Sequence, residues 1–134
     1  MIYDISPTIT PALAVFPGDT PPRREVLQDL ERGDHLTLST LHATVHLGAH
    51  LDAPSHCTAD APGIDALALE TCYGTCQVVA IAKRSGRICP GDLDVPVEAP
   101  RVLFRTGSFP DPERWTPDFA SLSAELIKSL HAQG

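Results

Sequence analysis

The alternation of apolar and polar residues predicts short strands separated by proline-rich turns. Residues 35–45 alternate leucine with threonine and serine, which is typical of a strand with one buried face. Residues 74–82 end in a continuous apolar run, which indicates a strand buried on both faces. Shorter strand candidates lie at residues 2–5, 23–27 and 101–106.

One helix is predicted near the C-terminus, over Ser121–His131. Apolar residues recur there at helical spacing, and they are Leu122, Leu126, Ile127 and Leu130. Ser121 or Ser123 can cap the start of this helix, and Gly134 can end it. Residues 64–69 can add one or two helical turns, whereas the prolines at positions 7 to 22 exclude a helix there.

Together these elements predict a single domain over residues 1–134, of mixed α/β class, mostly β with few helices. A chain of 134 residues can bury roughly two thirds of its unfolded surface. The apolar fraction of 43% is that of an ordinary globular chain. The pattern leads us to expect a further strand after the helix, so we predict that the chain is truncated at its C-terminus.

The charge balance narrows the expected partners. Seventeen acidic residues against ten basic residues give a formal net charge of −7. Nucleic acids and anionic membranes attract clustered lysine and arginine, so neither is an expected partner. We expect a small-molecule substrate and a homodimer. We find no signal peptide and no apolar run of about 20 residues, so the expected location is the cytoplasm.

The four cysteines are predicted to be free thiols rather than disulfides, because no secretion signal is visible. Cys72 and Cys76 do not have the usual spacing of a zinc site. Cys57 is predicted to lie in the core, because it directly follows His56 and would alternate onto the opposite face of an extended chain.

The segment His46–His56 concentrates the chemistry of the chain. Its even positions are His46, Gly48, His50, Asp52, Pro54 and His56, and its odd positions are Leu47, Ala49, Leu51, Ala53 and Ser55. In an extended segment these two sets face opposite sides, so one face is expected to be apolar and packed. Imidazole nitrogens and carboxylate oxygens on the other face are suitable ligands for Zn²⁺ or Mn²⁺.

Geometry requires this segment to bend. A straight strand would separate the first and last histidines by about 30 Å, too far for a shared ion. Gly48 and Pro54 are the expected bends, because glycine is conformationally free and proline ends ladder pairing. We therefore expect His46, His50 and Asp52 to converge on one ion, with His56 facing it.

Two other interpretations of the segment stay open. His46 and His50 could form a pair on one helix face, as in H-E-x-x-H metalloproteases, although no Glu follows His46 and Gly48 lies between them. Alternatively, the segment is a half-exposed strand whose histidines meet solvent. His42, outside the segment, is predicted to be structural or solvated.

The pattern H-x-G-x-H-x-D-x-P-x-H over residues 46–56 resembles the signature of the cyclase-like family of metal-dependent hydrolases. Its best-known members are bacterial kynurenine formamidases, also called arylformamidases. Asp4–Ser6, Phe16–Pro21 and Pro100–Thr106 are also similar to that family, so the resemblance extends over essentially the whole chain. It implies a domain of the swivelling β/β/α type. It also implies a C-terminal portion with a further His and Glu ligand, which cannot be assigned here.

The resemblance implies hydrolysis of N-formyl-L-kynurenine to L-kynurenine and formate in tryptophan degradation. It implies that His46, His50 and Asp52 hold one divalent ion, Zn²⁺ or Mn²⁺, and that Asp52 bridges to a second ion if two are bound. His56 is implied as the general acid/base and Phe16 as a wall of the substrate pocket, although Phe16 could instead fill the core. Two alternatives stay open, namely another aryl-amide or cyclic-amide hydrolase, for example of isatin, and a non-catalytic metal-binding or subunit-interaction protein.

Overall fold

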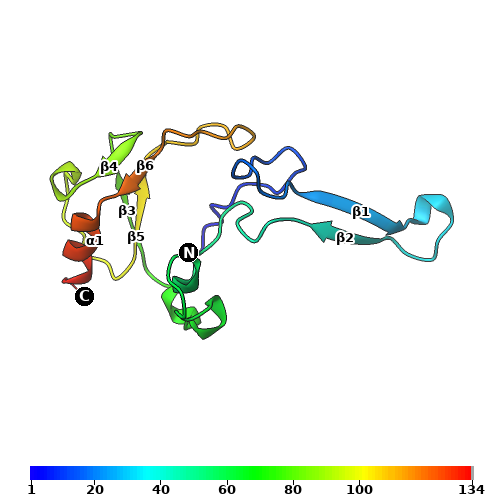
Figure 1. Ribbon diagram of the computed structural model, residues 1–134, viewed down its shortest axis with the longest axis horizontal. Coiled ribbons are helices and arrows are strands. Elements are labelled where there is room, and N and C mark those ends of the chain that lie inside the picture. Colours follow the sequence, from blue (N-terminus) through cyan, green and yellow to red (C-terminus); the bar gives the residue numbers. More distant parts are fainter. Residues whose placement is uncertain (134) are drawn as a thin grey trace. The chain divides into compact units, whose positions relative to one another are not determined.

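The computed structural model describes residues 1–133, and Gly134, predicted to end the helix, lies outside the described residues. The chain divides into two compact units (Figure 1). Unit 1 comprises Met1–Ala61 and Asp111–Trp115, and unit 2 comprises Pro62–Pro110 and Thr116–Gly134. The single domain expected from the sequence stays a prediction.

Unit 1 contains an antiparallel hairpin of β1, Arg23–Gln28, and β2, Leu38–His42 (Figure 1). A 3-10 turn, η1 (Leu30–Arg32), lies between the strands. The strand predicted at 23–27 is therefore confirmed, whereas the strand predicted over 35–45 is shorter than expected. The pairing ends where Arg23 meets His42, because Pro21 and Pro22 precede Arg23 and have no N–H to continue the ladder.

Two predictions for unit 1 are wrong. Residues 2–5 form no strand, and the backbone N–H of Ser6 instead donates to Asp4 Oδ1 at 2.9 Å, a local side-chain bond that competes with strand pairing. Cys57 is exposed rather than buried in a core, because it ends the 3-10 turn η2 (Pro54–His56) instead of continuing an extended segment.

Unit 2 contains two parallel strand pairs. β3, Gln77–Ala80, pairs with β5, Val102–Arg105, and both strands were predicted. β4, Gly86–Ile88, pairs with β6, Ala120–Leu122, and neither was predicted. Burial on both faces is wrong for β3, since Val79 is 1% exposed and Val78 is 61% exposed. Only the face with Val79 packs against the core.

The core of unit 2 forms around the only α-helix of the described residues, α1, Ala124–His131. Ser123 caps the helix, since its Oγ accepts a hydrogen bond from the backbone N–H of Leu126 at 3.1 Å. The buried residues of this core are Val79, Ile81, Ile88 and Leu126. The predicted helix is confirmed but starts later than residue 121, because Ser121 belongs to β6.

Two polar side chains, those of Ser108 and Asp92, connect loops of unit 2 through hydrogen bonds. The hydroxyl of Ser108, 8% exposed, lies 2.7 Å from the carbonyl oxygen of Arg84 and accepts from the N–H of Ala120 at 3.0 Å. At the 3-10 turn η5 (Pro90–Asp92), the carboxylate of Asp92 accepts from the N–H of Cys89 and from Lys83 Nζ, each at 2.7 Å. These hydrogen bonds, the one from Cys89 first, lower the pKa of Asp92 below its usual value of 3.8.

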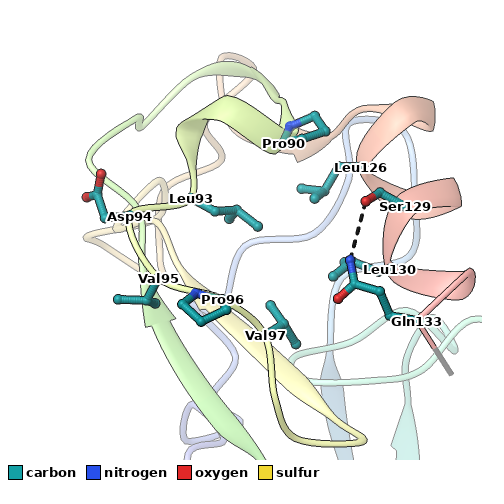
Figure 2. A pocket seen from close by; sticks show the side chains of 10 residues that line it. All are labelled: Pro90, Leu93, Asp94, Val95, Pro96, Val97, Leu126, Ser129, Leu130 and Gln133. Carbon is teal, nitrogen blue, oxygen red and sulfur yellow. Dashed lines mark hydrogen bonds between the residues drawn. The ribbon is translucent and has the colours of Figure 1, made fainter.

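A groove of about 380 Å³ lies between α1 and the chain from Pro90 to Val97. Leu93, Leu126 and Leu130 point into it, and Ser129 and Gln133 form a hydrogen bond at its side (Figure 2). None of the histidines of the segment 46–56 lines this groove.

Two further 3-10 turns, η3 (Ile64–Ala66) and η4 (Leu69–Thr71), confirm the short helical turns predicted near residues 64–69. The mixed, mostly β class with few helices is confirmed. All four cysteines are free thiols, as predicted. Within residues 1–133, no helix has the length and apolar character needed to cross a membrane.

Candidate metal centre

The segment after β2 bends at both predicted places. Gly48 has a φ of +64°, the left-handed region that favours glycine, and Pro54 starts the turn η2. A Cβ at position 48 would lie 3.7 Å from the side chain of Leu13 and 3.8 Å from that of Pro7. The bend at Gly48 therefore packs against the N-terminal part of unit 1. The predicted apolar packing of the odd positions is wrong, because the bends break the alternation and leave Leu51 51% exposed.

These bends bring His46, His50 and Asp52 together. His46 Nδ1 lies 3.0 Å from Asp52 Oδ1 and 3.2 Å from His50 Nε2, and His50 Nε2 lies 3.5 Å from Asp52 Oδ1. The cluster is open to solvent, since each histidine side chain is 32% exposed and that of Asp52 is 50% exposed. The predicted convergence is therefore present, and the interpretation of the two histidines as a pair on a helix is wrong, because the segment is not helical.

The spacing of these three atoms fits a tetrahedral cation. Zn²⁺ binds imidazole nitrogen at about 2.0–2.1 Å, so two ligands at the tetrahedral angle are separated by about 3.3 Å. The three observed separations, 3.0, 3.2 and 3.5 Å, bracket that value. Two imidazoles and one carboxylate also form a common donor set for zinc. His46, His50 and Asp52 can therefore hold one ion and leave a further coordination position open.

Hydrogen bonding prepares His50 for this role. Its Nδ1 lies 2.9 Å from the carbonyl oxygen of Gly48, which can only accept, so Nδ1–H is the donor. In the neutral imidazole, a proton on Nδ1 leaves the lone pair on Nε2, the atom that lies 3.2 Å from His46 Nδ1. Gly48 therefore supplies both the bend and the acceptor that orients the ring.

His56 stands beside the cluster rather than in it. Its ring centroid lies 4.5 Å from that of His46, with the two planes inclined at 58°. His46 also meets His50 edge-on, with centroids 5.0 Å apart. The imidazole of His56 therefore lies next to the proposed ligands, and His56 is exposed to solvent.

Phe16 is 62% exposed, so it does not fill a core. Its ring meets Trp115 edge-to-face, with centroids 5.3 Å apart and planes at 79°. Such aromatic pairs are favourable beyond the area they bury. No local pattern predicts this pairing, because the two residues are far apart in the chain.

Two residues that sequence reasoning did not single out connect the loop of Phe16 to the histidines. Asp19 Oδ2 accepts from Thr44 Oγ1 at 2.6 Å, and Asp19 Oδ1 accepts from the N–H of Thr20 at 2.7 Å. The hydrogen bond from Thr44, then that from Thr20, lowers the pKa of Asp19 below its usual value of 3.8. Thr44 Oγ1 in turn accepts from the N–H of His46 at 3.2 Å. The available signal in the sequence was an Asp that directly follows Pro-Gly, a pair typical of turns.

Comparison with known protein families gives a match that covers nearly the whole chain. The sequence model of the family Cyclase, described as "Putative cyclase", matches residues 3–134. The matched range includes the cluster, His56 and the loop of Phe16 and Asp19.

Proposed function

The chain belongs to the Cyclase family, and from this membership we propose that it catalyses metal-dependent hydrolysis of an aryl formamide at the cluster of His46, His50 and Asp52. Family membership supports an enzyme of the metal-dependent hydrolase type. The observation that carries the proposal is the triangle of His46 Nδ1, His50 Nε2 and Asp52 Oδ1, with separations that fit a tetrahedral ion.

The proposed substrate is N-formyl-L-kynurenine, which water cleaves to L-kynurenine and formate. In this reaction a new C–O bond forms at the formyl carbon, the C–N bond breaks, and the aryl amine nitrogen takes a proton. A flat aromatic ring in the substrate suits the exposed face of Phe16, which Trp115 supports from its edge.

Each residue of the site then has a stated task. His46, His50 and Asp52 hold the ion, for which zinc is our first choice and manganese the second. When bound, such an ion polarises a carbonyl group and lowers the pKa of water toward about 7. His56 acts as the general acid/base and gives its proton to the departing amine, which is otherwise a poor leaving group. The ring of His56 lies against that of His46, with centroids 4.5 Å apart, and this position next to the ligands supports the proposed role.

A homodimer is proposed as the assembly. Its support is the exposed apolar surface of the β1–β2 hairpin, where Leu27, Leu38 and Leu41 are 52%, 47% and 61% exposed. Two-stranded hairpins are marginal in water without a partner surface. Sedimentation equilibrium tests this assembly, and a monomer at all concentrations would contradict it. The cytoplasmic location stays a prediction.

The test of the function is a hydrolysis assay on protein of defined metal content. Purified chain is stripped with a chelator, reloaded with Zn²⁺ or Mn²⁺, and mixed with N-formyl-L-kynurenine, with formation of L-kynurenine followed by absorbance. We expect turnover only in the reloaded protein. Isatin, assayed in parallel, tests the cyclic-amide alternative. Zinc binding without hydrolysis of either compound would refute the enzymatic proposal and support a non-catalytic metal-binding protein.

A further inference from the structure

The ligand His46 lies in a stretch without regular secondary structure, so side chains must fix its backbone. β2 ends at His42, and no helix or strand follows until the turn η2 at Pro54. An irregular backbone is held only by the hydrogen bonds that side chains and neighbouring loops provide. The hydrogen bond made by the N–H of His46 therefore helps to fix the position of its imidazole ring.

The loop before β1 provides a rigid base for such bonds. The N–H of Asp19 donates to the carbonyl of Phe16 at 2.9 Å, and Gly18 has a φ of +92°. With Pro17 before Gly18, this is the arrangement of a type II turn, in which proline fixes one dihedral and glycine supplies the positive φ. Asp19 thus leaves the turn in a defined direction.

From this base a hydrogen-bonded chain runs to the ligand. Thr44 Oγ1 donates its single proton to Asp19 Oδ2 at 2.6 Å. With its proton committed, the hydroxyl presents a lone pair to the N–H of His46, which donates to it at 3.2 Å. The N–H of Thr44 also lies 3.4 Å from the carbonyl of Thr20, a second tie between the same two stretches.

We propose that Asp19 and Thr44 are positioning residues for the metal centre, which hold His46 so that its Nδ1 stays within ligand distance of His50 and Asp52. The role rests on the metal site proposed above, and neither residue is itself a ligand. Asp19 fixes the direction of the Thr44 hydroxyl, and that hydroxyl fixes the backbone of His46. Loss of either bond leaves the imidazole free to leave the triangle and weakens the affinity for the ion.

The test compares Thr44→Val, Thr44→Ser and Asp19→Asn with the unchanged chain. Valine has the shape of threonine without the hydroxyl, serine keeps the hydroxyl, and asparagine keeps only one acceptor oxygen where two are used. Asp29→Asn is the matched control, because Asp29 also accepts a backbone N–H, that of Glu31 at 3.0 Å, but at the far turn of the hairpin. Zinc affinity is measured by competition with a chromophoric chelator, and Co²⁺-loaded protein supplies a visible absorption spectrum.

We expect Thr44→Val to weaken zinc binding by about 10- to 100-fold, the usual loss when a partner that orients a ligand is removed. Asp19→Asn should lie between this variant and the unchanged chain, and Thr44→Ser should restore most of the affinity. The Co²⁺ spectrum should change in Thr44→Val and stay unchanged in Asp29→Asn.

Equal zinc affinity and Co²⁺ spectra in Thr44→Val and the unchanged chain would overturn the positioning role. An equal loss of zinc affinity in Thr44→Ser and Thr44→Val would also overturn it. Serine keeps the hydroxyl, so an equal loss would mean that the substitution weakens the loop in general and that the hydroxyl does not position His46. If the unchanged chain itself binds neither Zn²⁺ nor Co²⁺, the proposed function fails together with this role. If the chain binds zinc but hydrolyses nothing, only the enzymatic proposal fails.

Discussion

Replacing His50 with alanine removes one corner of the ligand triangle. His50 Nε2 lies 3.2 Å from His46 Nδ1 and 3.5 Å from Asp52 Oδ1. Structural zinc sites with four ligands bind with about 10–16 kcal/mol, or roughly 3 kcal/mol per ligand. At about 1.4 kcal/mol for each factor of ten, His50→Ala should weaken zinc binding on the order of 10²-fold.

The folded protein should tolerate this change. The side chain of His50 is 32% exposed and packs in no core, so the melting temperature of metal-free protein should shift little. His42→Ala is the matched control, because His42 is also partly exposed and pairs with Glu25 at 2.8 Å on the hairpin, and it does not belong to the triangle. Isothermal titration with zinc at fixed pH measures both variants. Equal affinity of His50→Ala and His42→Ala would refute the assignment of His50 as a ligand.

Four further predictions follow from single contacts. His56→Ala should keep zinc affinity but lower kcat by about 10²- to 10⁴-fold, the usual loss for a general acid/base, and unchanged turnover would remove His56 from the chemistry. Gly48→Ala should cost about 1 kcal/mol of stability in urea denaturation, because φ is +64° while the added Cβ meets only ordinary contacts; no loss would argue against the left-handed bend. Ser108→Ala should cost about 1–3 kcal/mol of stability, because it removes the hydrogen bonds that the buried Ser108 hydroxyl makes with the carbonyl of Arg84 and the N–H of Ala120. Ser121→Ala, which loses a solvent-exposed hydrogen bond from Arg87, should cost under about 0.5 kcal/mol, and equal losses would contradict the role of Ser108. The pKa of Asp92 is lowered in the folded state, so the stability that its carboxylate contributes is present above the unfolded pKa and is lost as the pH falls through the folded pKa. Asp92→Asn should therefore reduce the fall in melting temperature that the protein shows as the pH is lowered. An unchanged fall would refute the contribution of Asp92 to stability.

The elements that the sequence predicted are those with strong local signals. The continuous apolar run near Val79 and the helical spacing of the apolar residues around Leu126 are local patterns that can be recognised without knowing a partner element. The helix start was less certain because Ser121 and Ser123 can both cap, and only pairing of Ser121 in β6 decides between them.

The elements that the sequence missed depend on distant partners. β4 and β6 are three residues each, and Ile88 and Leu122 form strands only because they pair with each other across the chain. Parallel pairing of this kind leaves no local pattern. The same reason hides the contact between Phe16 and Trp115.

The candidate site was largely predictable, because its ligands lie close together in the chain. His46, His50 and Asp52 could be selected by ligand chemistry, and Gly48 and Pro54 by their backbone preferences. The bonds from Asp19 and Thr44 could not, since the fold alone brings a turn near residue 18 to the end of β2.

The central claim is that two imidazoles and one carboxylate of this segment bind a cation, and X-ray absorption at the zinc edge of the zinc-loaded chain tests it most directly. We predict a shell of nitrogen and oxygen at about 2.0–2.2 Å with the outer signal of imidazole rings, and its loss in His50→Ala. A sulfur shell at about 2.3 Å from the free cysteines, or a chain that retains no zinc, would contradict the account.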